Sequence, residues 1–470
     1  MTLLRRLYAW VDDRLGISST ILPIITHPVP RNLTWWYVLG SATLIALVMQ
    51  IITGVGLAFT YVPAANSAYE SLEFITNRAM LGNIVRGLHY WGSSAMVVLI
   101  FAHMASAFLM ASYKYPRELS WLSGVLLLGL TLGMAFTGQL LRWNQDAYWA
   151  VVLVAAQASR TPLIGDWLTQ IIVAGQTVGG ATLTRFYATH VFLLPAIMFG
   201  LIGIHLYLVI RHGVSEPPKP GEPVDPATYT QRYNERLHRD GIPFWPDFAW
   251  RDVVIAVVAG SIVLLLAIVV GAPELGKKAD PTLLEAHPKP DWYFLWLFAL
   301  IAHVPPELET IFILGFPLLV GLLLVVLPFV APYGERSAWR RPWAIGIVGF
   351  STVAIAALVW EGYRAPWSPA LHARLPTEVT ARLEGSAREG GGVFEQKGCL
   401  SCHVIAGAGG LRGPELTAIG ARLSREQLTW RILYGGYNMP AYGTTLKPDE
   451  LNALVDFLGI QQGGRTKKGH

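Results

Sequence analysis

The chain has 470 residues, of which 53% are hydrophobic and only 14% are charged, so its composition excludes an ordinary soluble protein and indicates a membrane protein. The formal net charge is +5, but the basic residues lie in loops between apolar segments, a pattern that orients a protein in a bilayer and argues against a nucleic-acid partner. The two cysteines lie in one short motif, which excludes a disulfide framework.

The amphipathic N-terminal segment 1–14 lacks an apolar core with a cleavage site, so we expect no cleaved signal peptide. Seven apolar segments approach or exceed the roughly 20 residues that a spanning helix needs. They are 33–61, 84–111, 120–141, 186–211, 251–271, 308–331 and 342–361. An eighth, 292–304, is short and precedes two prolines, which predicts a helix near the membrane interface. The bias of Lys and Arg among the loops predicts a cytoplasmic N-terminus, and an odd number of spans then places the C-terminus on the periplasmic or outer side.

These segments predict an all-α protein, with a seven-helix transmembrane bundle and a small α-helical domain. Residues 1–215 form a four-helix domain, and 216–250 form a Pro-rich and charged loop on the cytoplasmic side. Residues 251–361 supply three further spans. A polar linker, 362–388, then leads to a small soluble domain at 389–470.

Four histidines lie inside apolar spans, where an ionisable group is costly and indicates function. His89 and His103 are 14 residues apart in the second span, and His190 and His205 are 15 residues apart in the fourth. Both intervals are close to four helical turns, so the two rings of one helix point the same way about 21 Å apart. Because the two spans run parallel, His89 can face His190 and His103 can face His205, and each pair can hold the iron of one porphyrin. Taken singly, each would be a packing histidine with one hydrogen bond.

The 14-residue interval recurs in the glycines of two neighbouring spans, which are Gly40 and Gly54 in the first and Gly124 and Gly138 in the third. Glycine lets helices or a flat group approach closely, so we predict that these four residues line haem pockets. Close helix packing is the alternative for any one of them. Arg86 and Arg117 lie at the outer and inner helix ends, where we expect them to bind haem propionates or to anchor the topology.

At these motifs the chain resembles the cytochrome b of cytochrome bc complexes, the quinol-oxidising electron-transfer complexes of respiration and photosynthesis. The resemblance rests on QIITG at 50–54, RGLH at 86–89, PREL at 116–119 and TRFYATH at 184–190. It covers about residues 20–361, and the 15-residue interval is similar to the chloroplast and Gram-positive branch. In that branch the four-helix and three-helix parts are separate proteins, whereas here they look fused. The resemblance implies two non-covalent b-type haems, quinone and lipid as ligands, and a homodimeric complex.

The stretch PDWYF at 290–294 lies in the outer loop before the sixth span and looks like the Pro-Glu-Trp-Tyr motif of this family. The resemblance implies that Asp291 and Tyr293 are catalytic residues of the quinol site, and a partly desolvated carboxylate suits a base that takes a proton from quinol. Aspartate is one methylene shorter than glutamate, which suggests a bridging water or a shifted quinol. The alternative is that Asp291 only caps the short helix. Val38 stands where the chloroplast and Gram-positive branch attaches an additional haem through a cysteine, so we expect no such covalent haem.

Cys399, Cys402 and His403 form a C-x-x-C-H motif, which is typical of a covalently attached c-type haem with the histidine as an iron ligand. A redox C-x-x-C or half of a zinc site is the alternative, which the lack of a second cysteine pair disfavours. Met439 is the only methionine after the motif and is the predicted sixth ligand. A buried core methionine is the alternative. Amphipathic patterns near 393–397 and 448–458 predict the packing helices of a class I cytochrome c.

Together these features predict a subunit of a quinol:cytochrome c oxidoreductase in an energy-transducing inner membrane. The resemblance implies a Q-cycle, in which quinol gives one electron to a Rieske protein and one to the outer b haem. The attached cytochrome c would pass the Rieske electron to a soluble or membrane acceptor. A Rieske cluster needs two Cys and two His, and both cysteines are used here, so the Rieske protein is expected on a separate chain. Two alternatives are a dihaem anchor of a dehydrogenase, which would have no reason for PDWYF, and a non-enzymatic membrane tether for a cytochrome c.

Overall fold

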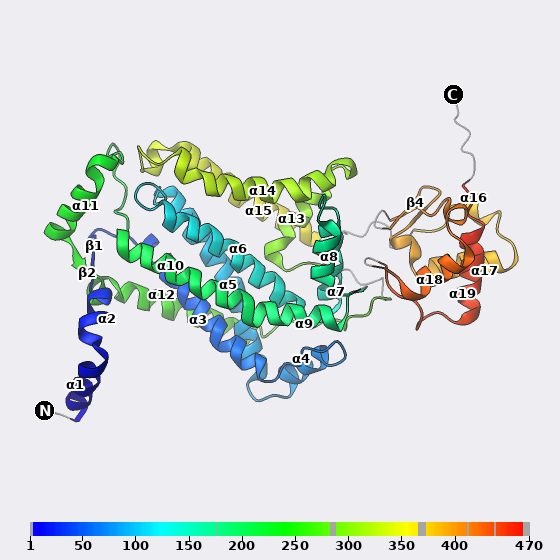
Figure 1. The fold of residues 1–470 in the computed structure, drawn as a ribbon, viewed down its shortest axis with the longest axis horizontal. Helices are drawn as coiled ribbons and strands as arrows, with labels where there is room; N and C mark the ends of the chain where they lie inside the picture. Colours follow the sequence, from blue (N-terminus) through cyan, green and yellow to red (C-terminus); the bar gives the residue numbers. More distant parts are fainter. Residues whose placement is uncertain are drawn as a thin grey trace.

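The computed structural model describes residues 3–175, 177–282, 288–364, 373–410, 413–436 and 439–463. These residues are mostly helical, and the all-α prediction is confirmed. A long helical bundle carries a smaller C-terminal domain beyond one of its ends (Figure 1). Residues 365–372 of the predicted linker lie outside the described residues.

Seven helices of the described chain are long and apolar enough to cross a membrane, which confirms the predicted number. Their mean hydropathies lie between 1.7 and 2.8, because nearly all their charged residues are at the ends. The spans are η1–α3 (Trp35–Val38, Leu39–Ala58), α5 (Gly82–Leu109), α6 (Glu118–Leu140), α9–η2–α10 (Gly180–Ala188, Thr189–Leu193, Leu194–His212), α12 (Trp250–Val269), α14 (Pro306–Val330) and α15 (Pro342–Arg364).

The first four spans pack as two helix pairs. Helix α3 runs along α5, and α6 runs along α10. Helix α12 covers the α3–α5 pair, and the short helix α13 (Trp292–Ala302) packs against α15. Small residues allow the close contact between α5 and α12, because a Cβ at Gly87 would lie only 3.1 Å from the Cβ of Ala267.

Three short helices gather at the end of the bundle that faces the C-terminal domain (Figure 1). They are α4 (Ala68–Asn77), α7 (Gln145–Ser159) and α8 (Gly165–Val173). The length criterion for spanning segments does not detect α7 or α8, because neither helix is long enough to cross a membrane. Their apolar faces instead bury one another, with Val151, Ala155 and Val173 fully inaccessible to solvent. Asn144 caps the start of α7 by accepting a 3.0 Å hydrogen bond from the Ala147 amide.

The opposite end of the bundle holds the N-terminal helices α1 (Leu3–Leu15) and α2 (Ile17–Ile25), together with α11 (Pro226–Asp240) (Figure 1). Helix α11 lies within the predicted loop 216–250 and is capped by Asp225, whose carboxylate accepts from the Ala227 amide. A two-residue antiparallel pair, β1 (Pro28–Val29) with β2 (Ile242–Pro243), joins the N-terminal segment to η3 (Phe244–Phe248), just before α12.

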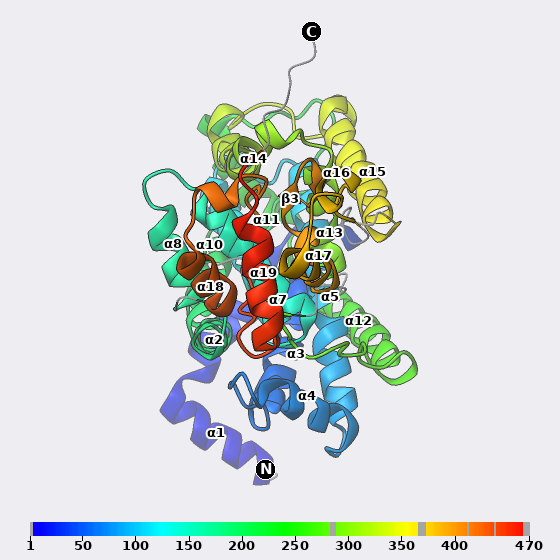
Figure 2. The same cartoon turned by 90° about the vertical axis from the view of Figure 1, so that its right-hand side faces the viewer.

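The C-terminal domain has its own core. Its elements are α16 (Thr377–Thr380), α17 (Gly385–Gln396), η5 (Cys399–Ser401), the β3–β4 pair (Val404–Ile405, Ala408–Gly409), η6 (Ile419–Ala421), α18 (Arg425–Tyr434) and α19 (Pro448–Gly459). The two predicted packing helices are α17 and α19. They can cross closely because Gly390 has no side chain, and a Cβ there would clash with the Ala453 carbonyl. Leu375 and Leu383 belong to the same core and precede the predicted boundary at residue 389. Figure 2, viewed from this end, shows α17, α18 and α19 in front of the bundle.

Candidate functional site

The imidazole rings of His89 on α5 and His190 on η2 face each other between the two helix pairs. Their ring centres lie 6.5 Å apart, and the ring planes meet at 83°. An imidazole nitrogen lies about 2 Å from a metal that it ligates and the ring centre roughly 1 Å further, so two axial ligands of one iron have ring centres about 6 Å apart. His103 and His205 are likewise electrostatic neighbours. The structure therefore brings together both predicted pairs, and the spacing of His89 and His190 fits an iron between them.

In three of these four rings, the Nδ1 atom is hydrogen-bonded to a hydroxyl side chain on the neighbouring helix. Thr53 contacts His89 at 2.9 Å, Thr137 contacts His190 at 3.0 Å, and Ser123 contacts His205 at 2.8 Å. Each hydroxyl already donates its proton to a backbone carbonyl of its own helix, at 2.7, 2.8 and 3.0 Å. Each hydroxyl must therefore accept from Nδ1–H, which leaves the lone pair of the histidine on Nε2. That is the tautomer that a metal ligand needs.

These hydroxyls were not predicted from the sequence, although a signal was present. In three cases the hydroxyl residue directly precedes one of the predicted glycines, as in Thr53-Gly54, Ser123-Gly124 and Thr137-Gly138. The fourth glycine, Gly40, follows Leu39, which has no hydroxyl. The glycine interval and the hydroxyl interval are thus parts of one pattern.

The four predicted glycines lie directly against the histidine rings. A Cβ on Gly138 would lie 2.7 Å from Cε1 of His190, and one on Gly54 would lie 3.2 Å from Cε1 of His89. At Gly40 the corresponding distance to His103 is 3.2 Å, whereas at Gly124 it is 3.6 Å from His205, an ordinary contact. The glycines therefore make room for the rings that would hold a porphyrin, most strictly at position 138.

The fourth span contains one π-helical turn, η2 (Thr189–Leu193), which includes His190. A π turn accommodates one more residue than an α turn does. This extra residue explains why the His190–His205 interval is 15 while the His89–His103 interval is 14. The two rings of this span still face the same partner helix.

Arg86 and Arg117 are buried and bonded to protein groups. Arg86 donates to Thr76 Oγ1 at 3.0 Å and to the Pro273 carbonyl at 2.5 Å. Arg117 donates to the carbonyls of His212 and Gly213, both at 3.0 Å, and to the hydroxyl of Tyr229 at 2.8 Å. These contacts correspond to the anchoring alternative, and a propionate contact for either arginine stays a prediction.

In the C-terminal domain, Cys399 begins η5 and packs against the apolar core, and burial raises the pKa of its thiol to about 12. The Nδ1 atom of His403 donates to the Pro414 carbonyl at 2.8 Å, again leaving the lone pair on Nε2. A Cβ on Gly413 would lie 2.5 Å from this ring, so glycine is required beside it. The attachment motif is thus held in a geometry that fits a haem iron on Nε2 of His403.

Met439 packs against the same core as Cys399. The Gly436 amide donates to the Met439 carbonyl at 2.9 Å. Tyr442, three residues further, is electrostatically close to both cysteines, and burial raises the pKa of its phenol. The loop of Met439 therefore returns to the attachment motif. Residues 437 and 438 lie outside the described residues.

We expect Met439→Ala to leave the haem covalently attached while abolishing the thioether-to-iron charge-transfer band. The reason is that the two thioether bonds to haem do not depend on the sixth ligand, whereas this band requires a sulfur on the iron. Optical spectra of the oxidised protein check this. An unchanged band would exclude Met439 as the ligand.

Asp291 of the predicted quinol site lies where the loop before α13 meets the end of α6. Arg142 Nη2 donates to Asp291 Oδ1 at 3.0 Å, and the Tyr293 hydroxyl donates to Oδ2 at 2.9 Å. Burial raises the pKa of Tyr293 well above its usual value, and the Asp291 carboxylate raises it further, so Tyr293 keeps its proton. Although Asp291 precedes the first residue of α13, its side chain makes no capping bond to this helix. The capping alternative is therefore wrong.

One further carboxylate was not singled out in the sequence. Asp252, in the first turn of α12, is only 9% exposed, and both of its carboxylate oxygens lack a hydrogen-bond partner among the described residues. Ser41 of α3 is its polar neighbour, close to Gly40 and His103. A buried unpaired carboxylate is costly and indicates function. The only signal in the sequence is an acidic residue that begins an apolar span.

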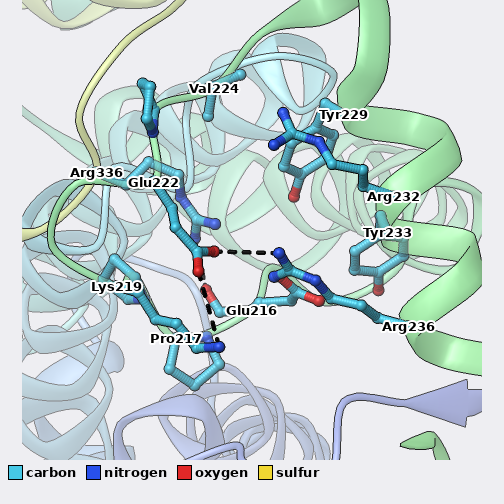
Figure 3. Close-up of a pocket in the computed structure, with 12 residues that line it drawn as sticks. Glu216, Pro217, Lys219, Glu222, Val224, Tyr229, Arg232, Tyr233, Arg236 and Arg336 are labelled. Carbon is cyan, nitrogen blue, oxygen red and sulfur yellow. Dashed lines mark hydrogen bonds and ion pairs between the residues drawn. The ribbon is translucent and has the colours of Figure 1, made fainter. Parts of the chain in front are cut away.

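A pocket of about 440 Å³, counted with its opening to solvent, lies between the loop after α10 and α11 (Figure 3). Both of its carboxylates are in ion pairs: Arg236 donates to Glu216 at 2.7 Å and to Glu222 at 3.1 Å, and Lys219 lies 3.9 Å from Glu222. None of the predicted site residues lines it. We interpret this pocket as a salt-bridged junction of the loop.

Three family models match the chain. The model described as Cytochrome b/b6/petB matches residues 24–213, and the one described as Cytochrome b(C-terminal)/b6/petD matches residues 278–377. The model described as Cytochrome C oxidase, cbb3-type, subunit III matches residues 385–458.

Curated relatives and solved structures agree with these matches. Cytochrome b of Allochromatium vinosum is 32% identical over 75% of this chain and 87% of its own length. The menaquinol:cytochrome c reductase cytochrome b subunit of Bacillus subtilis is 39% identical over 46% of this chain and 100% of its own length. A solved structure described as a hyperthermophilic respiratory Complex III superposes with a TM-score of 0.65 at 26% identity, covering 76% of this chain and 91% of that one. The chain therefore belongs to the cytochrome b family of bc complexes and carries a cytochrome c domain at its C-terminus.

Proposed function

We propose that this chain is the cytochrome b and c subunit of a Rieske-type quinol:cytochrome c oxidoreductase that works by a Q-cycle. The observation that carries the proposal is the pair His89 and His190, with ring centres 6.5 Å apart and Nδ1 atoms bound to hydroxyls. When bound, two b-type haems and one c-type haem would supply one-electron carriers.

In this proposal His89 and His190 hold one b haem toward the outer side, and His103 and His205 hold the other toward the inner side. Thr53, Ser123 and Thr137 keep three of the imidazoles in the ligating tautomer. Gly40, Gly54, Gly124 and Gly138 leave room for the rings and for the flat group between them. Arg86 and Arg117 hold the helix ends beside the pockets and are the cations available for propionates.

Asp291 and Tyr293 form the outer quinol site. Asp291 accepts a proton from quinol, and Tyr293, which keeps its own proton, orients the carboxylate through their 2.9 Å hydrogen bond. On the inner side, Asp252 is the buried carboxyl group that would pass a proton to quinone, and it lies beside Ser41, the residue after Gly40 of the His103 pocket. Proton uptake and release on opposite sides would couple electron flow to proton translocation.

Cys399, Cys402, His403 and Met439 hold the c haem, which places an electron acceptor for the Rieske protein on the same chain. Because both cysteines serve this motif, the Rieske cluster belongs to a separate protein. The complex is proposed to be homodimeric, to contact lipid and quinone, and to pass electrons to a soluble or membrane acceptor.

The chain is a multi-pass protein of an energy-transducing membrane. We propose a cytoplasmic N-terminus and a periplasmic C-terminal domain in the inner membrane. The support is the excess of basic residues on the N-terminal side and the odd number of spans, which puts the two termini on opposite sides.

A dihaem dehydrogenase anchor and a non-enzymatic tether remain as rivals for the activity. Purification of the complex with its native partners, followed by haem quantitation and a quinol:cytochrome c assay, tests the proposal. We expect two non-covalent haems for each covalent one and an activity that quinol-site inhibitors abolish. Fewer non-covalent haems, or a complex that does not oxidise quinol, would contradict it.

In the same complex, Asp291→Asn is expected to slow quinol oxidation by roughly 100-fold or more while both b haems remain, because an amide cannot accept the proton. The neighbouring Asp280→Asn, in the same connecting segment, is the matched control and should leave the rate unchanged. Steady-state rates at saturating quinol measure both. Full activity of Asp291→Asn would remove Asp291 from the mechanism.

A further inference from the structure

Each oxygen of the Asp291 carboxylate already accepts one hydrogen bond. Oδ1 accepts from Arg142 at 3.0 Å, and Oδ2 accepts from Tyr293 at 2.9 Å. The side chains of Arg142 and Asp291 are only 18% and 12% exposed, so solvent screens their ion pair weakly. The two residues are 149 positions apart in the chain, and in the sequence Arg142 stands out only as a loop cation.

The end of α6 also fixes the backbone around Asp291. The Asp291 amide donates to Gln139 Oε1 at 3.3 Å, and the Lys289 amide donates to Asp146 Oδ1 at 3.1 Å. Arg142 itself donates to the Gln139 carbonyl at 3.3 Å. The PDWYF loop is therefore held against α6 and α7, and the Arg142 guanidinium links the end of α6 to Asp291 of this loop.

We infer that Arg142 is a positioning residue of the quinol site, which holds the Asp291 carboxylate turned toward α6 until this ion pair opens to let it accept a proton. The inference rests on the proposed function of Asp291. Aspartate is the shorter acid at this position of the motif, and the contact with Arg142 ties it to the end of α6.

The charged and titratable groups around Asp291 are Arg142 after α6, Tyr293 on α13, Tyr90 on α5, Tyr363 on α15 and Asp146 on α7. Arg142 is the cation that contacts the carboxylate. Tyr293 keeps its proton, and burial raises the pKa of Asp146, so neither replaces a lost positive charge. Without Arg142, a poorly exposed carboxylate loses its counter-ion and is costlier to keep ionised.

The test is the pH dependence of quinol oxidation in the purified complex, with haem content measured for every variant. Arg142→Gln keeps hydrogen-bond donors but removes the charge. It is expected to move the acid limb of the pH profile upward by about one unit, and so to lower the rate by up to about tenfold on the acid side of that limb. The rate should recover at alkaline pH. Arg142→Lys, which restores a cation, should recover the wild-type profile in large part.

A merely structural role would lower the rate equally at every pH, and that result would overturn the inference, as would an unchanged profile in Arg142→Gln. The double variant Arg142→Gln/Asp291→Asn shows whether the inference about Arg142 fails or the proposed role of Asp291 fails. If Arg142 acts through Asp291, Arg142→Gln adds nothing in the Asp291→Asn background. Full activity of Asp291→Asn alone would instead remove the proposed role of Asp291, on which the inference depends.

Discussion

Replacing His190 with leucine is expected to remove one of the two non-covalent haems and to abolish quinol oxidation, while the covalent haem stays. Leucine fills a similar volume but offers no lone pair, and the facing His89 would then be the single ligand from this pair. In the structure the two rings are the groups that converge from opposite helix pairs, 6.5 Å apart. Loss of His190 should therefore lower haem affinity by more than the roughly 10–100-fold that is typical when a hydrogen-bond partner of a metal ligand is replaced.

Thr137→Val gives the graded comparison for this variant. It removes the hydroxyl that accepts from Nδ1 of His190 at 3.0 Å but leaves Nε2 in place. We expect the haem to be retained with weaker affinity, by about 10-fold or more. The covalent haem in each preparation is the internal standard, and pyridine haemochrome spectra give the ratio. Two non-covalent haems per covalent haem in His190→Leu would show that His190 is not a ligand.

Substituting alanine for Gly138 is expected to disrupt the outer haem pocket, whereas the same change at Gly124 is expected to be tolerated. The added Cβ would lie 2.7 Å from Cε1 of His190 at position 138 but 3.6 Å from Cε1 of His205 at position 124. The first distance forces the ring or α6 to move, at a cost of about 1–3 kcal/mol. The second is ordinary van der Waals contact.

The two substitutions are well matched, because they add the same methyl group to the same helix and face equivalent rings. We expect Gly138→Ala to lower haem occupancy and the quinol oxidation rate by about tenfold, and Gly124→Ala to change either by less than about twofold. Haem quantitation and steady-state assays on the purified complex measure both. Equal effects at the two positions would show that the distance to the histidine does not decide the outcome.

Much of this protein follows from local patterns in the sequence. Hydrophobic length alone predicts the seven spans, because a bilayer demands about 20 apolar residues from each crossing helix. The attachment motif Cys399 to His403 is also local, since its residues are neighbours in the chain. The facing of His89 with His190 follows from helical period and span direction, and both of these can be read from the order of residues alone.

Two local features were not predicted from the sequence, for a physical reason. Helices α7 and α8 have modest length, and their helical state depends on the apolar cluster that includes Val151 and Val173 and that only the folded chain assembles. The π turn at Thr189–Leu193 leaves no composition signal, although the 15-residue histidine interval hinted at it.

The sequence by itself determined which residue types stand at which helical intervals: the histidines, the glycines and the cysteine motif. The tertiary structure alone decided their chemistry, because the partners come from other helices. Thr53, Ser123 and Thr137 select the tautomer of three histidines across helix contacts. Arg142 meets Asp291 from 149 residues away. Such contacts depend on how the spans pack against one another, and the residue pattern within a single span does not predict that packing.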